Sequence, residues 1–245
     1  DFLANASHEL RTPLTSLSGF IETLRGPARD DVEARDRFLE IMQGQADRMR
    51  RLISDLLSLS RIELVEHRPP EGEADLADVV REVVDAMEPV AAERGVEVRV
   101  TGAEDPVIVT GVRDELAQVV QNLVDNAVKY SDAKGVVQID LVAGMSRDGA
   151  SARAGRQWED AGHMSIVASP GPARAMSAAL RVTDAGPGIE RQYLPRLSER
   201  FYRVDPGRGL RPGTGLGLAI VKHVVQRHRG ELLVESEPGD RKSVV

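Results

Sequence analysis

A histidine, a carboxylate and a hydroxyl stand close together in the segment Ser7-His8-Glu9-Leu10-Arg11-Thr12-Pro13-Leu14. An apolar repeat with alternating spacings of four and three runs through it, at Leu10, Leu14, Leu17, Ile21 and Leu24. This spacing is typical of a helix that packs against other helices. His8 lies one position off the repeat and Thr12 follows one turn later, so both face outward. The pattern fits a reactive imidazole held on a rigid helix, and it equally fits an ordinary coiled-coil histidine.

A second polar group lies on an otherwise aliphatic helix, where Asn122, Asn126, Lys129 and Tyr130 follow one another at helical spacing. Spacings of four and three residues place these side chains on adjacent faces of the helix. Two amide oxygens suit a hard cation such as Mg²⁺, which uses few protein ligands and retains water and phosphate oxygens. Lys129 could contact a phosphate. The alternative interpretation is an asparagine pair at capping or packing positions.

Two glycine motifs complete the set of candidate binding segments. In Asp184-Ala-Gly186-Pro-Gly188-Ile189, the glycines allow a ligand to approach the backbone and the carboxylate can accept a hydrogen bond from an amine. By itself this motif also fits an ordinary turn. Gly213-Thr-Gly215-Leu-Gly217 directly precedes a helix, where exposed amides and the positive helix end favour an anion. It differs from the dinucleotide-binding fingerprint because no strand leads into it.

Arginine side chains accompany the second glycine motif. Phe201-Tyr202-Arg203 is followed by a glycine- and arginine-rich stretch that includes Arg208 and Arg211. These cations could contact phosphates, or they could form an ordinary solvated surface.

The elements that must position these groups begin with two helices. The first covers residues 1 to about 25 and the second ends near Arg61, so residues 1–62 form an antiparallel hairpin. The apolar stripes are too wide for two helices to bury. A four-helix bundle from two chains would bury them, and we therefore predict a homodimer. Residues 63–73, with two prolines and few apolar groups, read as a linker.

The second predicted domain covers residues 74–245 and mixes helices with strands, which favours an α+β class. Helices are expected at 76–93 and 113–130, and a last helix follows the second glycine motif. Strands are expected at 96–100, 107–110, 137–141, 180–183 and 232–234, and again at the C-terminal end. Residues 143–179 are rich in glycine and proline and are predicted to be an insert, either disordered or a contact surface, although Met164 to Val167 could pair as a short strand.

Composition excludes several classes of function. The net charge of −7 argues against generic nucleic-acid binding. The absence of cysteine excludes disulfides and thiolate metal sites. No apolar run is long enough to span a membrane. Because the chain begins without Met, already in helical register, we expect it to be a fragment of a longer protein.

Taken in order, these motifs resemble the ATP-binding fold shared by sensor histidine kinases, type II topoisomerases, Hsp90-like chaperones and mismatch-repair ATPases. With the Ser-His-Glu-Leu-Arg-Thr-Pro-Leu segment ahead of them, the chain resembles the catalytic core of a bacterial sensor histidine kinase over nearly its whole length. The segments Leu17-Ser-Gly-Phe-Ile-Glu-Thr-Leu and Asp55-Leu-Leu-Ser-Leu-Ser-Arg-Ile-Glu are similar to those of phosphate-regulon sensors.

The resemblance implies a dimeric four-helix bundle followed by an α+β two-layer sandwich that binds ATP and Mg²⁺. His8 would accept the γ-phosphate with the help of Glu9, and Thr12 would orient the water that dephosphorylates the partner. The partner would be the receiver domain of a response regulator. The parent would be a bacterial inner-membrane sensor, with this chain in the cytoplasm and its membrane segments elsewhere.

The same resemblance assigns the ATP contacts. Asn126 would bind Mg²⁺, with Asn122 as a second ligand or support. Lys129 and Arg203 would contact phosphates, and Asp184 would accept from the adenine amine. Tyr130 and Ile189 would pack near the base, and a lid of roughly 205–213 would cover the phosphates. The remaining ATP-binding positions are Gly186, Gly188, Gly213, Thr214, Gly215, Leu216 and Gly217.

Two further functions are compatible with part of the pattern. A conformational ATPase of the same fold would leave the His-Glu-x-x-Thr-Pro hairpin unexplained. A degenerate kinase that acts as a dimeric scaffold would not require the intact Asn126, Asp184 and glycine motifs.

Overall fold

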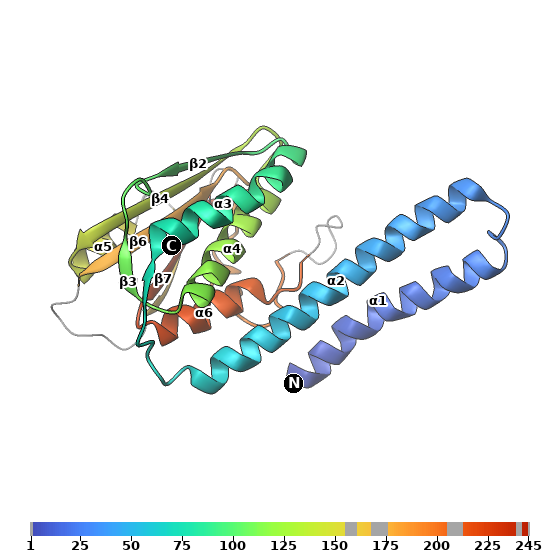
Figure 1. Ribbon diagram of the computed structural model, residues 1–245, viewed down its shortest axis with the longest axis horizontal. Coiled ribbons are helices and arrows are strands. Elements are labelled where there is room, and N and C mark those ends of the chain that lie inside the picture. The colour runs from blue at the N-terminus through green and yellow to red at the C-terminus, as the bar shows by residue number, and fades with distance from the viewer. Residues whose placement is uncertain (1, 155–160, 168–175, 205–212, 239–241, 245) are drawn as a thin grey trace.

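A long helical hairpin precedes a sheet domain in the computed structural model, which describes residues 2–154, 161–167, 176–204, 213–238 and 242–244 (Figure 1). Helix α1 (Phe2–Arg25) and helix α2 (Val32–Val65) run antiparallel. Asp31 caps α2 by accepting from the amide of Ala34 at 2.9 Å. Helix α2 continues one turn beyond its predicted end, and no described helix combines the length and apolar character needed to cross a bilayer.

The hairpin buries one part of its apolar surface and exposes another. The rings of Phe20 and Phe38 pack across it, with centroids 5.3 Å apart. Leu52, Leu59 and Ile62 of α2 are buried and belong to the same core as α6 of the second domain. Large apolar side chains that stay exposed lie on both helices, among them Leu14, Ile21, Ile53 and Leu57.

The second domain is built on a six-stranded sheet with the strand order β2-β4-β6-β8-β7-β5. Strands β2 and β4 are parallel, and the other neighbouring pairs are antiparallel. The strands are β2 (Glu97–Thr101), β4 (Val136–Met145), β5 (Gly162–Val167), β6 (Ser177–Asp184), β7 (Glu231–Ser236) and β8 (Lys242–Val244). A separate two-stranded sheet joins β1 (Glu73–Asp75) to β3 (Ile108–Thr110).

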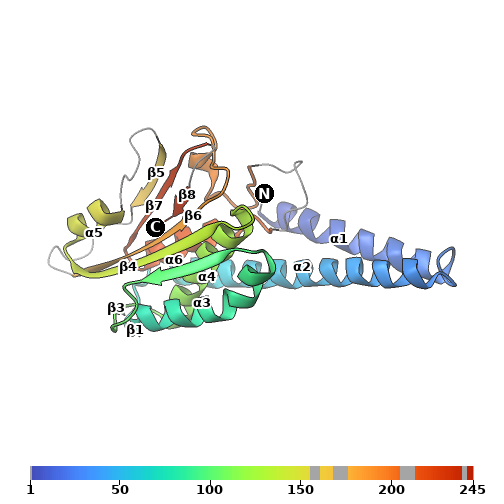
Figure 2. The same ribbon diagram turned by 90° about the horizontal axis from the view of Figure 1, so that it is seen from above.

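Three helices cover one face of this sheet: α3 (Leu76–Glu93), α4 (Arg113–Tyr130) and α6 (Gly217–Arg227) (Figure 2). The core between the layers is aliphatic and includes Val120, Val124, Ile139 and Ile220, each with no exposed surface. The predicted α+β two-layer architecture is therefore confirmed. The short elements α5 (Arg147–Ala154) and η1 (Leu194–Arg196) complete the described structure.

The predicted insert at 143–179 contains regular structure where it is described. Helix α5 lies within it, and β5 pairs with β7, which confirms the predicted strand at Met164–Val167. Residues 155–160 and 168–175 of this insert lie outside the described residues. The segment between the two domains is shorter than the predicted linker at 63–73, because α2 continues to Val65 and β1 begins at Glu73.

Polar contacts fix the second domain against α2. Arg200 forms an ion pair with Glu63, and His223 Nδ1 lies 3.1 Å from Glu66 Oε2. Together with the shared apolar core, these contacts bring α6 and the region that precedes it alongside the hairpin (Figures 1 and 2).

Candidate functional site

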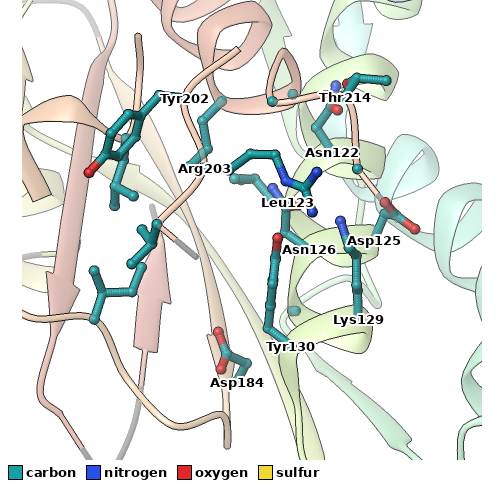
Figure 3. A pocket seen from close by; sticks show the side chains of 18 of the residues that line it. Asn122, Leu123, Asp125, Asn126, Lys129, Tyr130, Asp184, Tyr202, Arg203 and Thr214 are labelled. Atoms are coloured by element: carbon teal, nitrogen blue, oxygen red, sulfur yellow. The ribbon is translucent and has the colours of Figure 1, made fainter. Parts of the chain in front are cut away.

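A cavity of about 1060 Å³ lies between the second domain and the hairpin. Its walls come from α4, from the loop after β6, from the glycine-rich segment before α6, and from α2. Figure 3 shows Asp184 and Thr214 at opposite ends of this cavity, with the side chains of α4 between them. The cavity is large enough to hold a nucleotide.

Helix α4 supplies one wall because its aliphatic face packs on the sheet and its polar face turns to the cavity. Asn122, Asn126, Lys129 and Tyr130 all line it. The Asn122 amide nitrogen donates to the Gln118 carbonyl at 2.8 Å. The side-chain oxygen of Asn122 lies close to Gly217, because a Cβ added at Gly217 would be 2.7 Å from this oxygen. The Asn122 oxygen therefore faces the start of α6.

The loop after β6 forms the opposite end of the cavity. Asp184 is 6% exposed, and its Oδ1 accepts from the amide of Gly186 at 2.8 Å. The motif is thus a local turn, as the simpler interpretation predicted, and it also turns a carboxylate toward the cavity. Gly188 has a φ of +73°, and the carbonyl of Glu237 occupies the place of a side chain. Glycine is required there.

The glycine-rich segment is held close to its neighbours. The amide of Phe201 donates to the Gly215 carbonyl at 2.8 Å, and a Cβ at Gly215 would lie 2.7 Å from the Phe201 carbonyl carbon. The Thr214 hydroxyl accepts from the amide of Leu216 at 3.3 Å. Helix α6 begins at Gly217, so its N-terminal amides open toward the cavity. Residues 205–212 of the predicted lid lie outside the described residues.

Lys129 places an ammonium group at the cavity. Its side chain is buried, and its Nζ lies 4.8 Å from the centre of the Tyr130 ring. Burial lowers the pKa of Lys129 to about 8, Asp125 opposes that change, and the charges of Arg203 and Arg51 add to it. Arg203 extends toward α4 (Figure 3). A cationic cluster of this kind favours a polyanionic ligand.

The wall formed by α2 was not predicted from the sequence. Arg48, Arg51, Ser54 and Asp55 all line the cavity. Their spacing places them on one face of α2, off the apolar repeat, and this periodicity was a usable signal. Asp55 accepts from the Thr214 hydroxyl at 2.7 Å. Burial raises the pKa of Asp55, opposed by Thr214 and Arg51, and the charge of Asp125 raises it further.

The predicted catalytic group lies beside the cavity rather than in its wall. His8 and Thr12 are exposed on α1, and the Thr12 hydroxyl donates to the His8 carbonyl at 3.3 Å. Glu9 pairs with Arg48 of α2, with Oε2 and Nη2 3.0 Å apart. Because Arg48 lines the cavity, it connects the surroundings of His8 to the candidate nucleotide site.

Nearly all the predicted ATP-binding residues meet at this one cavity. Two of them do not line it. Gly186 instead donates its amide to the Asp184 carboxylate, and the side chain of Leu216 is fully buried in the core. The fold and the site together define a two-layer domain with a cavity of nucleotide size, docked on a helical hairpin that carries a histidine.

Comparison with known families agrees with this class. Residues 1–64 match the His Kinase A phospho-acceptor domain, and residues 111–245 match the histidine kinase-, DNA gyrase B- and HSP90-like ATPase. The phosphate regulon sensor protein PhoR of Pseudomonas aeruginosa is 37% identical over 240 residues, which is 98% of this chain and 47% of that protein. The chain belongs to the bacterial sensor histidine kinases, and the expected likeness to phosphate-regulon sensors is confirmed. It spans about half the length of this relative.

Solved structures share the fold. The histidine kinase AdeS of Acinetobacter baumannii superposes with a TM-score of 0.64 at 23% identity, over 97% of this chain and 95% of that one. The histidine kinase ThkA, solved in complex with the response regulator protein TrrA, superposes with a TM-score of 0.61 at 17% identity, over 99% of this chain and 60% of that one. The likeness covers the hairpin and the second domain together.

Proposed function

We propose that this chain binds ATP with Mg²⁺, phosphorylates its own His8 and passes the phosphoryl group to an aspartate of a response regulator. The observation that carries the proposal is the position of the cavity. It is walled by the α4 and glycine motifs on one side and by the hairpin that bears His8 on the other. The two family matches support the same assignment, in which the hairpin carries the phospho-acceptor and the second domain binds ATP.

The two ends of the cavity suit the two ends of ATP. Asp184 is buried and lines the cavity together with Tyr130 and Ile189, and its carboxylate can accept from the exocyclic amine of adenine. At the other end, Lys129, Arg203 and the N-terminus of α6 offer positive charge to the phosphates. This polarity would place the γ-phosphate toward the hairpin.

The donor set of α4 fits a magnesium ion that is held together with phosphate. Asn126 and Asn122 supply neutral amide oxygens one turn apart, and no cluster of three acidic or histidine side chains among the described residues competes with them. Mg²⁺ commonly takes few protein ligands and completes its shell with phosphate oxygens and water. When bound, it would neutralise charge on the transferring phosphoryl group.

The chemistry follows from positioning and charge neutralisation. One imidazole nitrogen of His8 attacks the γ-phosphorus, an N–P bond forms, and the P–O bond to ADP breaks. Glu9 accepts the proton from the other ring nitrogen, so that the attacking nitrogen becomes more nucleophilic. A carboxylate of the response regulator then attacks the phosphohistidine and regenerates His8.

Two further proposals concern the partners. Exposed Leu14, Ile21, Ile53 and Leu57 support the predicted homodimer, because a second hairpin would cover this apolar surface. The outward Thr12 hydroxyl, one turn from His8, supports a second activity in which the chain dephosphorylates its response regulator. ThkA provides a precedent of the same fold bound to a response regulator.

The test is incubation with γ-labelled ATP. We expect an acid-labile, base-stable label on the wild-type chain and none on His8→Ala. A chain that hydrolyses ATP without becoming labelled would instead support the conformational ATPase. Failure to bind ATP with Mg²⁺ in calorimetry would support the dimeric scaffold. Light scattering tests the dimer, which Ile53→Asp combined with Leu57→Asp should dissociate.

A further inference from the structure

Arg48 stands between the predicted proton acceptor and the nucleotide cavity. Its Nη2 lies 3.0 Å from Glu9 Oε2, and this contact joins α2 to α1 across the hairpin. The same side chain lines the cavity, one turn from Arg51. Arg48 is thus in contact with the residue beside His8 and also faces the space where the phosphates would lie.

Stability of the hairpin does not account for this pair. The two side chains are 30% and 37% exposed. Ion pairs with that degree of exposure contribute little to stability because water and salt screen them. Apolar contacts such as that between Phe20 and Phe38 already hold the two helices together. The Arg48–Glu9 pair is therefore a minor part of what holds the hairpin together.

The geometry of the pair leaves Glu9 able to accept a proton from His8. The guanidinium engages Oε2, and a carboxylate can accept further hydrogen bonds on its second oxygen. A single contact of this kind fixes the direction of the carboxylate without occupying both oxygens. In addition, a negative charge beside His8 repels an incoming phosphate, and a guanidinium 3.0 Å away offsets that repulsion.

We propose that Arg48 is a positioning residue for the autophosphorylation reaction. It orients the Glu9 carboxylate toward the imidazole of His8 and offsets its charge while the γ-phosphate arrives from the cavity. The proton still passes from the imidazole to Glu9, and Arg48 takes no part in bond formation. This inference rests on the proposed function, because it assigns Arg48 a role in that same step.

The experiment is a double-mutant cycle between Arg48→Gln and Glu9→Gln, read as the initial rate of His8 phosphorylation at saturating ATP. With intact Glu9, Arg48→Gln should lower the rate roughly tenfold, a fraction of what general-base catalysis supplies. Arg48→Lys should restore most of it. In the Glu9→Gln background the same substitution should change the rate less than about twofold, because Arg48 acts through Glu9.

Two controls separate this role from others. Arg50→Gln removes an arginine of the same helix that is 80% exposed and pairs with Asp47, and it should leave the rate unchanged. The ATP affinity of Arg48→Gln, measured by calorimetry, should equal that of the wild type within about twofold. Circular dichroism and light scattering verify that each variant is folded and dimeric.

The outcomes are distinct for the two proposals. An equal loss in both backgrounds, or a clear loss of ATP affinity in Arg48→Gln, would overturn the positioning role and identify Arg48 as a phosphate contact. A wild-type chain that acquires no label, or a label that persists in His8→Ala, would overturn the proposed function and this inference together.

Discussion

The Thr214 hydroxyl donates a hydrogen bond of 2.7 Å to Asp55 Oδ2, and this bond ties the glycine-rich segment of the second domain to helix α2. The two residues are 159 positions apart in the chain. Asp55 is partly buried, and this burial raises the pKa of its carboxylate. The cavity keeps its wall of hairpin residues only while the two domains stay docked in this way.

Asp55→Ala should therefore loosen the docking. A hydrogen bond to a charged group contributes about 1.5 kcal/mol or more, so the undocked population should rise roughly tenfold. Because the chain has no cysteine, spin labels can be placed at introduced cysteines, for example at Arg50 of α2 and Glu104 of the second domain. Pulsed dipolar spectroscopy should record a broader distance distribution. An unchanged distribution, equal to that of the exposed control Glu40→Ala, would contradict the prediction.

Lys129 should make ATP binding depend on pH. Its pKa of about 8 is lowered chiefly by burial, so a fraction of the free protein lacks this proton at pH 8. A triphosphate favours the protonated ammonium, and binding should take up a proton. Affinity should fall by up to about tenfold per pH unit above that pKa.

Calorimetry in buffers of different ionisation enthalpy measures this proton uptake. Lys129→Met should bind ATP more weakly and lose the uptake near pH 8. The same pKa shift has a consequence for stability. Between about 8 and the ordinary value of 10.5 the unfolded chain binds more protons, so the Lys129 contribution to stability rises with pH across that window. Proton uptake unchanged in Lys129→Met would show that another group titrates.

Asn126→Ala should remove the magnesium dependence of ATP binding. Loss of one ligand oxygen should weaken binding by about tenfold, which corresponds to ~1.4 kcal/mol. Adding EDTA should reduce the wild type to the level of the variant and leave the variant unchanged. Asp114→Ala, at an exposed position in the first turn of the same helix, is the matched control. A variant that still responds fully to EDTA would refute the assignment of Asn126.

The parts of this molecule that were predictable share one property, which is that their signal is local. Helices α3 and α4 were predicted at their observed bounds because apolar periodicity runs through both, and Asp75 and Gly95 mark the two ends of α3. The site residues of α4 and of the glycine motifs were equally local, since each set stands within one turn or loop. The fold then brings these local motifs together at one cavity.

The features that were missed depend on tertiary contacts. Strand β1 has three residues, too few for a periodic pattern, and it exists because β3 pairs with it. Helix α2 extends beyond Arg61 where Ile62 is buried in the core shared with the second domain. Arg48 and Asp55 could be recognised as part of one face of α2. The residues that this face contacts are determined by how the second domain docks on the hairpin. No local pattern encodes that orientation.

Thr12→Ala should separate the two proposed activities. The hydroxyl lies one turn from His8 on the exposed face of α1, where it could orient a water at the phosphorylated partner. Partner dephosphorylation should slow roughly tenfold or more, because positioning of the attacking water is lost, while autophosphorylation changes little. Thr23→Ala is a matched control, since Thr23 donates to the Gly19 carbonyl in the same helix-backbone geometry. Equal loss of both activities would refute the division of roles.

His228 should make the second domain sensitive to mild acid. Its Nε2 accepts from the amide of Val112 at 3.2 Å, and its Nδ1 donates to the Val224 carbonyl at 2.8 Å. Only the contact with Val112 requires the neutral ring, because protonation would remove the acceptor that the Val112 amide needs, whereas Nδ1 donates to Val224 in either state. Burial lowers the pKa of His228 below 6.5, against the opposing charge of Glu115.

The sign follows from the two protonation states. As pH falls through 6.5 the unfolded chain takes up the proton first, so the contribution of neutral His228 is complete above 6.5 and is lost below it. Urea titrations at pH 7.5 and pH 5.5 should show the wild type losing more stability than His228→Gln. At pH 7.5 the variant should itself be less stable by ~1–2 kcal/mol, the cost of an unsatisfied buried amide. The exposed His67→Gln should behave as the wild type, and a pH response retained in His228→Gln would place the titrating group elsewhere.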